Sequence, residues 1–298
     1  MASPKISVIL SLFRAERFLR RYFENVLEQS ILDSIELSIV HNDPTEEERA
    51  IIDEFATRIH MVRCEVPRES LYTSWNRAIA QSTGDYLVCW NADDLRTTNS
   101  LECMANTLNK DSLVGWTYGD FLISKVFGEM RGKAINSPEW SRELGTRGAI
   151  GGPFFMWRRN LISSVGWFDE QFRSGGDFDY TVRLSLASKG ARTPVILGYF
   201  LDEHSGLSTL GELQAIERTV IQLRYAIYET LDWHYIPPAL YFRITNLLQP
   251  GNSWVAIEKD IIGYEDLIAS RRPYAWKIPF HSIKAALRRQ IVKYVMNR

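Results

Sequence analysis

Two patterns of apolar and polar positions follow each other in turn along the first 110 residues of the chain: short runs of consecutive apolar residues, and stretches in which apolar residues recur every three or four positions. Runs of consecutive apolar residues are typical of strands buried on both faces, and apolar residues that recur every three or four positions are typical of one face of a helix. The predicted strands are residues 6–12, 36–40, 59–64 and 86–90, and the predicted helices begin near residues 18, 45, 71 and 100. This alternation predicts an α/β fold with a mixed, mostly parallel sheet flanked by helices.

The pattern is weaker beyond Asp111. The long polar segment 135–152 has no strong period, and a loop of that length is more often functional than idle. From Leu213 the apolar residues return to helical spacing, so we divide the chain into an α/β domain, residues 1–210, and a helical C-terminal region, residues 211–298. Further strands are predicted at 116–124, 153–157 and 193–200, with a helix at 177–188.

Composition narrows the class of protein. The 298 residues can bury a substantial core, and 45% apolar with 24% charged residues are ordinary globular values. A net charge of −1 gives no reason to expect a nucleic acid partner. The three cysteines form no CxxC pair, which favours a reducing compartment. The sequence opens without a signal peptide and contains no apolar run near the roughly 20 residues of a membrane span, so we expect a cytoplasmic protein.

The end of the chain is basic. No acidic residue follows Asp266, and between Ile283 and Val295 apolar residues recur every four positions with lysines and arginines beside them. A helix of this kind can bind an anionic lipid surface, and it can equally well pack on its own domain. Residues 271–298 are therefore a candidate membrane-binding segment, which allows a peripheral position on the inner face of the membrane.

A cluster of polar residues follows the strand predicted at residues 86–90. The cluster is Asn91, Ala92, Asp93 and Asp94. Adjacent carboxylates repel each other and are costly to desolvate unless a cation or hydrogen-bond donors offset them. Parallel sheets bind ligands at the carboxyl ends of their strands, and Mg²⁺ and Mn²⁺ prefer carboxylate and phosphate oxygens. The cluster is therefore either a divalent-cation site or a turn that caps the next helix.

Two common phosphate-binding loops are missing from the sequence. Residues 11–16 follow the first strand without a glycine, whereas a dinucleotide-binding turn needs G-x-G-x-x-G at that place. No G-x-x-x-x-G-K-[ST] loop occurs anywhere in the chain. The sequence thus argues against a Rossmann dehydrogenase and a P-loop NTPase. A divalent cation that holds the diphosphate is a different solution, which the strand-end cluster could supply.

Four motifs, taken in order, resemble the family 2 glycosyltransferases of the GT-A fold. They read SVILSLFRAERFLRRYFENVLEQS, IELSIVHNDPTEEE, SLYTSWNRAIAQSTGDYLVCWNADD and SGGDFDYTVRL. The resemblance covers about residues 4–210. It implies an inverting transfer of a sugar from a nucleotide-sugar donor to a hydroxyl of a saccharide or lipid-linked acceptor, with Mn²⁺ or Mg²⁺ as cofactor.

The resemblance also implies contacts with the nucleotide sugar. Phe13 stands where the family has a tyrosine that stacks on the base, and Ser11 and Arg14 replace the usual proline and asparagine. Asn42 stands where an aspartate hydrogen-bonds the base, and an asparagine can both donate and accept. The remaining implied contacts are Arg68, Tyr72, Asn76, Asn91, Ala92 and Asp93.

Cation ligands and a catalytic base are implied in the same way. Asp93 would be the main ligand, with Asp94 next; His204 would be a third ligand or an ordinary loop histidine. Asp177 matches the general base that takes the proton of the acceptor hydroxyl, and it could instead be the N-cap of the helix at 177–188. Asp179 has the spacing to pair with Arg183 on that helix.

The acceptor side is the least defined part of the resemblance. Gly152 and Trp157 correspond to its wall, where Trp157, or the nearby Trp140, would stack on a sugar or belong to the core. Two rival functions stay open. A nucleotidyltransferase also uses strand-end carboxylates, although its usual glycine-rich signature is missing. A non-catalytic nucleotide-sugar-binding module is favoured by neutral residues where the family is acidic, namely His41, Asn91 and Gly176.

Overall fold

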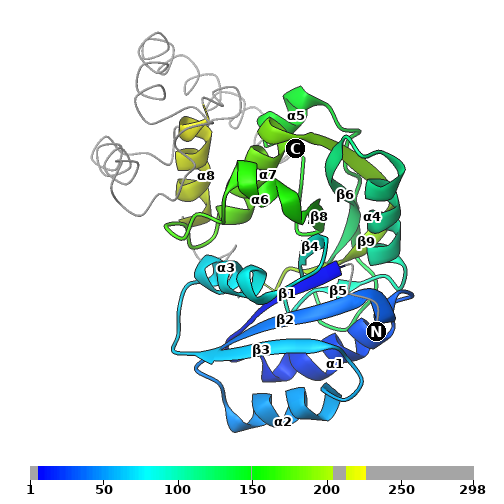
Figure 1. Ribbon diagram of the computed structural model, residues 1–298, viewed down its shortest axis with the longest axis vertical. Helices are drawn as coiled ribbons and strands as arrows, with labels where there is room; N and C mark the ends of the chain where they lie inside the picture. Colours follow the sequence, from blue (N-terminus) through cyan, green and yellow to red (C-terminus); the bar gives the residue numbers. More distant parts are fainter. Residues whose placement is uncertain (1–5, 149, 204–212, 226–298) are drawn as a thin grey trace, which may run out of the picture. The chain divides into compact units, whose positions relative to one another are not determined.

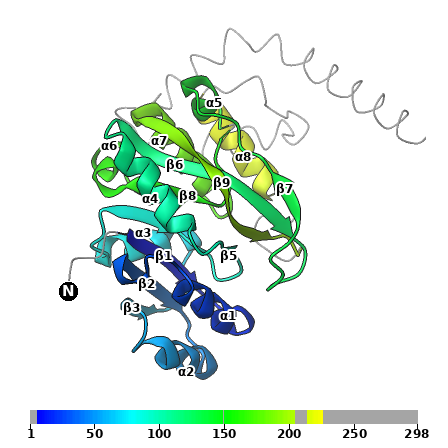
Figure 2. The same ribbon diagram turned by 90° about the vertical axis from the view of Figure 1, so that its right-hand side faces the viewer.

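The structure is a computed structural model that describes residues 6–148, 150–203 and 213–225 (Figures 1 and 2). The chain divides into two units, Met1–Leu210 and Gly211–Arg298. The described part of the second unit is helix α8, Leu213–Arg224. All other elements belong to the first unit.

Among the described residues, nine strands form one sheet. Strands β3, β2, β1 and β4 lie side by side and run parallel, and β8 then pairs antiparallel with both β4 and β6. The sheet continues through β6 to β9 in parallel and ends at β5, with β7 paired to β6. The bounds are β1 Ile6–Leu12, β2 Ile35–Asn42, β3 Met61–Val66, β4 Tyr86–Cys89, β5 Leu95–Arg96, β6 Val114–Ser124, β7 Lys133–Ile135, β8 Phe155–Arg158 and β9 Lys189–Leu201.

Helices cover both faces of the parallel half of the sheet. Helices α1 and α2 lie on one face of β1–β3 and α3 lies on the other (Figure 1). Apolar side chains of α1, α2 and α4 form the core together with Ile6, Val8 and Leu10 of β1. The bounds are α1 Glu16–Leu27, α2 Glu46–Phe55, α3 Leu71–Gln81, α4 Ser100–Lys110, α5 Arg142–Thr146, α6 Ile162–Val165 and α7 Gly176–Ala187, with short 3-10 turns η1 Leu32–Ser34 and η2 Arg159–Leu161.

The predicted mixed α/β fold is confirmed, and the elements of the first 110 residues begin and end within a few positions of their predicted bounds. The capping box before α2 is present, since the Thr45 hydroxyl accepts from the Glu48 N–H at 3.1 Å while the Glu48 carboxylate accepts from the Thr45 N–H at 3.0 Å. The three cysteines are free thiols. The polar segment 135–152, expected to be a loop, also contains the short helix α5.

No helix in the described part of the chain combines the length and the apolar character needed to cross a bilayer. The basic segment 271–298 lies outside the described residues, so its predicted helix and its membrane binding stay predictions.

Candidate functional site

A cavity of about 720 Å³ lies at the carboxyl ends of β1, β2 and β4. This volume is within the range of small-molecule sites, and the place in the sheet is the one where α/β proteins bind ligands. This single cavity is lined by the predicted base Asp177 and by most of the residues that the sequence predicted for the donor: Ser11, Phe13, Asn42, Arg68, Tyr72, Asn91, Ala92 and Asp93.

An aromatic ring and a guanidinium group lie together at one end of the cavity. The Phe13 side chain is 37% exposed, and the Arg68 guanidinium carbon is 4.1 Å from the centroid of its ring. The Arg14 guanidinium is 5.7 Å from the same centroid. Since a flat cation on an aromatic face is a stable arrangement that another flat group can extend, this end of the cavity suits a nucleobase.

Asn42 contributes to the wall of the cavity, with its amide held by the protein. Its Nδ2 donates to the hydroxyls of Ser11, at 3.2 Å, and Ser74, at 3.0 Å, and its Oδ1 accepts from the Glu69 N–H at 3.0 Å. The residue is 2% exposed. Its place beside the cavity agrees with the prediction, but its amide hydrogens are already engaged, so the direct contact with a base stays a prediction.

The two neighbouring aspartates have different positions. Asp93 lines the cavity, whereas Asp94 is 3% exposed, does not line it, and accepts from the Leu201 N–H at 3.2 Å. Burial raises the pKa of Asp93, and the nearby Glu203 carboxylate adds to this; burial and the charge of Asp93 raise the pKa of Asp94 well above its ordinary value. One oxygen of the Asp94 carboxylate is thus bonded to the β9 backbone outside the cavity lining, and the role of Asp94 as the next cation ligand stays a prediction.

Arg96 lies in the core, where its positive charge acts against the rise in the pKa of Asp94 that burial causes. It is completely buried, donates to the Cys89 carbonyl at 3.3 Å, and lies between the rings of Trp90 and Phe154 at 5.3 and 4.9 Å. Burial lowers the pKa of Arg96 to about 10, and the charge of Asp94 opposes that shift. Arg96 is therefore cationic at neutral pH and offsets negative charge below the cavity.

The donor set at Asp93 fits a divalent cation. In the described part of the chain, no three histidine, cysteine or acidic side chains come close enough to enclose a metal ion. Mg²⁺ and Mn²⁺ often take only one or two protein carboxylates and complete their shell with phosphate oxygens and water. The partly buried Asp93 carboxylate, which lines the cavity, is suited to such a shared site. His204 lies outside the described residues.

Asp177 lies in the first turn of α7 and lines the cavity. Gly175 occupies the N-cap position, so the alternative of Asp177 as N-cap is wrong. The Asp177 Oδ1 atom accepts from the Phe178 N–H at 2.8 Å. The positive end of the helix stabilises a carboxylate at this position.

The structure explains why Gly176 stands where the family has a glutamate. A Cβ atom added to Gly176 would lie 2.7 Å from the ring of Tyr72. Tyr72 is 1% exposed and packs at 5.3 Å from Trp75 and at 5.9 Å from Phe168, measured between ring centroids. The aromatic cluster thus fills the space that a side chain at residue 176 would need.

Besides Asp94, three predicted residues in the described part of the chain do not line the cavity. The Asn76 amide donates to the Phe168 carbonyl and accepts from its N–H, both at 2.9 Å, so it anchors that loop and the predicted nucleotide contact is corrected. Trp157 is 0% exposed and packs on Phe155 and Tyr180, so it belongs to the core and cannot stack on a sugar. Gly152 does not line the cavity, although its neighbour Pro153 does.

The sequence analysis missed one cationic residue of the cavity and undervalued another. Arg173 and Ser174 line it from the segment before α7, and Arg14 lines it beside Phe13. The signal for Arg173 was its distance of four positions from Asp177 in a short polar loop. Asp179 and Arg183, by contrast, form the predicted i,i+4 pair, fully buried at 2.7 Å.

Comparison with known proteins identifies the family. The model of the family described as glycosyl transferase family 2 matches residues 7–166. The chain is 22% identical over 187 residues to a chondroitin synthase of Pasteurella multocida, covering 62% of this chain and 19% of that protein. It is 23% identical over 232 residues to a PGL/p-HBAD biosynthesis glycosyltransferase of Mycobacterium bovis, covering 76% and 88%. The chain thus spans about a fifth of the length of the first of these relatives.

Solved structures share the fold. TarS 1-349 of S. aureus in complex with UDP-GlcNAc has a TM-score of 0.61 at 15% identity, over 82% of this chain and 71% of that one. The mannosyltransferase PcManGT of Pyrobaculum calidifontis in complex with GDP-Man and Mn²⁺ has a TM-score of 0.58 at 16% identity, over 96% and 81%. With the family match over more than half of its length, the chain belongs to glycosyl transferase family 2 and has the GT-A fold.

Proposed function

We propose that the protein is an inverting glycosyltransferase that moves a sugar from a nucleotide-sugar donor to a hydroxyl group of a saccharide or lipid-linked acceptor. The observation that carries this proposal is the shared cavity. A stacking surface at Phe13 and Arg68, a cation ligand at Asp93 and a candidate base at Asp177 all line it. These are the parts that a direct displacement at an anomeric carbon requires.

Charge in the cavity suits a nucleoside diphosphate. The guanidinium groups of Arg14, Arg68 and Arg173 belong to its lining and can meet phosphate oxygens. Phe13 offers its ring to the base. Solved relatives of the same fold hold UDP-GlcNAc and GDP-Man, which supports a nucleotide-sugar donor without deciding the base or the sugar.

Asp93 would hold a divalent cation, with Mn²⁺ and Mg²⁺ as the candidates. When bound there, the cation neutralises negative charge on the departing diphosphate. A cation at this place would offset the negative charge of the partly buried Asp93 carboxylate and of Glu203 nearby. His204 stays a proposed additional ligand.

Asp177 would act on the acceptor. Its carboxylate accepts the proton of the incoming hydroxyl as the oxygen bonds to the anomeric carbon and the bond from that carbon to the diphosphate oxygen breaks. Because attack comes from the face opposite the leaving group, the configuration of the sugar is inverted. The carboxylate lies in the first turn of α7, where the positive end of the helix favours negative charge.

The decisive experiment is a panel of uridine- and guanosine-linked sugars, tested with Mn²⁺ for thermal stabilisation and for release of nucleoside diphosphate. One donor should stabilise the protein and be hydrolysed slowly without acceptor. Stabilisation by a donor with no release, even with a wide set of saccharide acceptors, would favour the non-catalytic binding module. No stabilisation by any donor contradicts the proposal.

Asp177→Asn is the variant that tests the base. Asparagine keeps the size and a polar contact at residue 177 but accepts no proton, so donor binding should stay within about twofold while transfer falls by about 10² to 10⁴. Isothermal titration with donor and a transfer assay measure the two quantities. Undiminished transfer by the variant would remove Asp177 from the mechanism.

A further inference from the structure

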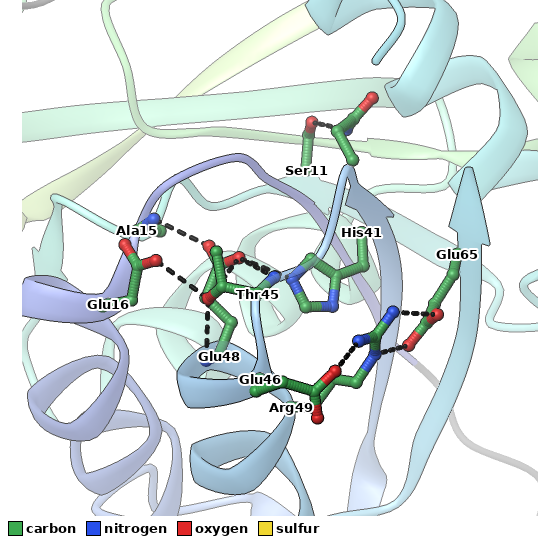
Figure 3. A network of polar contacts seen from close by, with 10 residues as sticks. Ser11, Ala15, Glu16, His41, Thr45, Glu46, Glu48, Arg49 and Glu65 are labelled. Carbon is green, nitrogen blue, oxygen red and sulfur yellow. Dashed lines mark hydrogen bonds and ion pairs between the residues drawn. The ribbon is translucent and has the colours of Figure 1, made fainter. Parts of the chain in front are cut away.

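A single buried carboxylate joins the two turns that carry the nucleotide end of the cavity. Glu48, in the first turn of α2, is 0% exposed. Its Oε1 atom accepts from the Ala15 N–H at 2.8 Å, and its Oε2 atom accepts from the Thr45 N–H at 3.0 Å and pairs with His41 Nε2 at 2.9 Å (Figure 3). The carboxylate therefore bonds the turn between β1 and α1 and the turn between β2 and α2 at once.

Both turns contain a residue in the left-handed region. Arg14 has φ 52° and precedes Ala15, while Asp43 has φ 40° and lies between His41 and Thr45. Residues other than glycine adopt this region at a cost and keep it where the surroundings determine their position. The Glu48 carboxylate bonds Ala15, which follows Arg14, and bonds His41 and Thr45, which lie two positions on either side of Asp43. These bonds help to hold both turns in place.

The direction of the His41 contact follows from the chemistry of its partner. Glu48 accepts from backbone N–H groups on both oxygens, so it is ionised and has no hydrogen to donate. These hydrogen bonds outweigh burial and lower the pKa of Glu48. His41, which is 2% exposed, must therefore donate from Nε2.

We propose that the pair of Glu48 and His41 positions the nucleotide end of the cavity. Through Ala15 the pair sets the turn that carries Phe13 and Arg14, and through His41 it sets the neighbouring Asn42. Neither member of the pair lines the cavity. The inference rests on the proposed function, because its ligand is a nucleoside diphosphate. Glu48 and His41 are positioning residues, which act on that ligand only through the residues that they hold in place.

A matched control lies at the other end of β2, the strand that contains His41. Glu36, at the beginning of β2, is 1% exposed and accepts from the Ser7 hydroxyl at 2.6 Å and from the Thr83 N–H at 2.8 Å. Glu36 and Glu48 are thus buried carboxylates of similar bonding, but only Glu48 contacts the turns at the cavity. A loss of general stability affects both variants, whereas a positioning role affects one.

The experiment compares Glu48→Gln with Glu36→Gln at a temperature where both are folded. Affinities for UDP and GDP with Mn²⁺ are measured by titration, and kinetic constants with the donor that the panel identifies. Glu48→Gln should bind the preferred nucleotide about tenfold or more weakly and raise KM with little change in kcat, because supporting residues of a site typically contribute that much. Glu36→Gln should bind within about twofold of the natural protein.

Two substitutions of His41 provide an independent test should Glu48→Gln fail to fold. His41→Gln keeps a side-chain N–H within reach of Glu48 and should keep most of the nucleotide affinity, whereas His41→Leu removes the donor and should lose it. Hydrogen exchange of the Ala15 amide gives a readout without any ligand. It should accelerate in His41→Leu and in Glu48→Gln, and stay slow in Glu36→Gln.

The outcomes separate this proposal from the function on which it rests. If the natural protein binds neither UDP nor GDP, the proposed function fails and the positioning role fails with it. If the natural protein binds a nucleotide and Glu48→Gln and His41→Leu bind it as well as Glu36→Gln does, only the positioning role is overturned. If nucleotide binding is weaker in Glu48→Gln and in His41→Leu only, and His41→Gln keeps most of the affinity, the positioning role is established.

Discussion

At the residue scale, the neighbouring carboxylates of Asp93 and Asp94 have different surroundings. Asp93 faces the cavity, and Asp94 lies below it with its Oδ1 at 3.2 Å from the Leu201 N–H and the buried Arg96 nearby. Both carboxyl groups have raised pKa values through burial, but of the two only Asp93 lines the cavity, so Asp93 is the one we propose to share a cation with a ligand. This difference leads to the first prediction.

Asp93→Ala should remove the dependence of donor binding on Mn²⁺, because the variant lacks the carboxylate that would share the cation with the diphosphate. Donor titrations with and without Mn²⁺ measure the effect and should coincide. Asp111→Ala is the control, since Asp111 pairs with Lys189 at 2.8 Å and does not line the cavity. A metal response in Asp93→Ala equal to that of the control would place the cation elsewhere.

Gly176→Ala tests the aromatic cluster beside Asp177. The added Cβ would lie 2.7 Å from the Tyr72 ring, and the neighbours of that ring leave it little room to move. Overpacking of this kind typically lowers the free energy of unfolding by about 1–3 kcal/mol. Denaturant unfolding measures it.

A double-mutant cycle supplies the control for Gly176→Ala. Tyr72→Leu removes the ring that the methyl group would meet, so the alanine should cost much less in that background. Equal costs in both backgrounds would show that the contact with Tyr72 is not the reason for the glycine.

At the scale of the elements, buried polar groups hold the ends of β2 in place. All eight residues of β2 are buried, and Glu36 and His41 are the ionisable ones among them. Glu36 bonds Ser7 and Thr83 at one end, and His41 bonds Glu48 at the other. Carboxylates thus bond both ends of β2 to neighbouring segments. Because carboxylates can be protonated, their contribution to the stability of the fold depends on pH.

Stability should fall in acid through these carboxylates. For Glu36 and for Glu48, burial acts to raise the pKa, but hydrogen bonds from Ser7 and Thr83, and from Ala15, His41 and Thr45, outweigh it, so both pKa values are lowered. A lowered folded-state pKa means that the stabilisation is complete above the unfolded value, near 4.5, and is lost as the pH falls through the folded value.

Unfolding free energies measured between neutral pH and about pH 3 test this expectation. The natural protein should lose stability as the pH falls below 4.5, and Glu36→Gln and Glu48→Gln should each lose less over the same range, because the titrating group is gone. Parallel curves for all three proteins would contradict the assignment.

At the scale of the whole molecule, we propose different roles for two parts of the chain. Residues 1–210 are the proposed catalytic domain, and the basic segment 271–298 is the candidate for membrane binding. Lys284, Arg288, Arg289 and Lys293 accompany an apolar stripe in that segment. Attraction to an anionic lipid surface is about 1 kcal/mol for each lysine or arginine near it. We propose that this segment brings the protein to a membrane that holds a lipid-linked acceptor.

Replacing those four basic residues by glutamate should abolish sedimentation with vesicles of phosphatidylserine and phosphatidylcholine, while donor binding by the α/β domain persists. The natural protein should sediment with these vesicles and release from them as the salt concentration rises. Absence of the natural protein from the vesicle pellet at low salt would leave the packed helix as the explanation of the basic stripe.

The sequence predicted well where neighbours along the chain decide the outcome. The Thr45–Glu48 capping box and the i,i+4 pair of Asp179 and Arg183 depend on a few consecutive positions, and both are present. Distant residues decided what the sequence left open or placed differently. Trp157, for which both a stacking role and a core position were open, belongs to a ring cluster with Tyr180, and the Asn76 amide, expected near the nucleotide, is bonded to Phe168, 92 positions away.

The sequence by itself determined the alternation of strands and helices, the family resemblance and the placing of carboxylates at the end of β4, because periodicity and local order carry that information. Only the tertiary structure decided that Asp93 faces the cavity and Asp94 does not, since the partner of Asp94 is the backbone of Leu201, 107 positions away. It likewise decided that Glu48 joins the turns at Ala15 and His41. Contacts between remote segments exist only after the chain has folded. They are the reason why two residues of the same type, such as Asp93 and Asp94, have different surroundings.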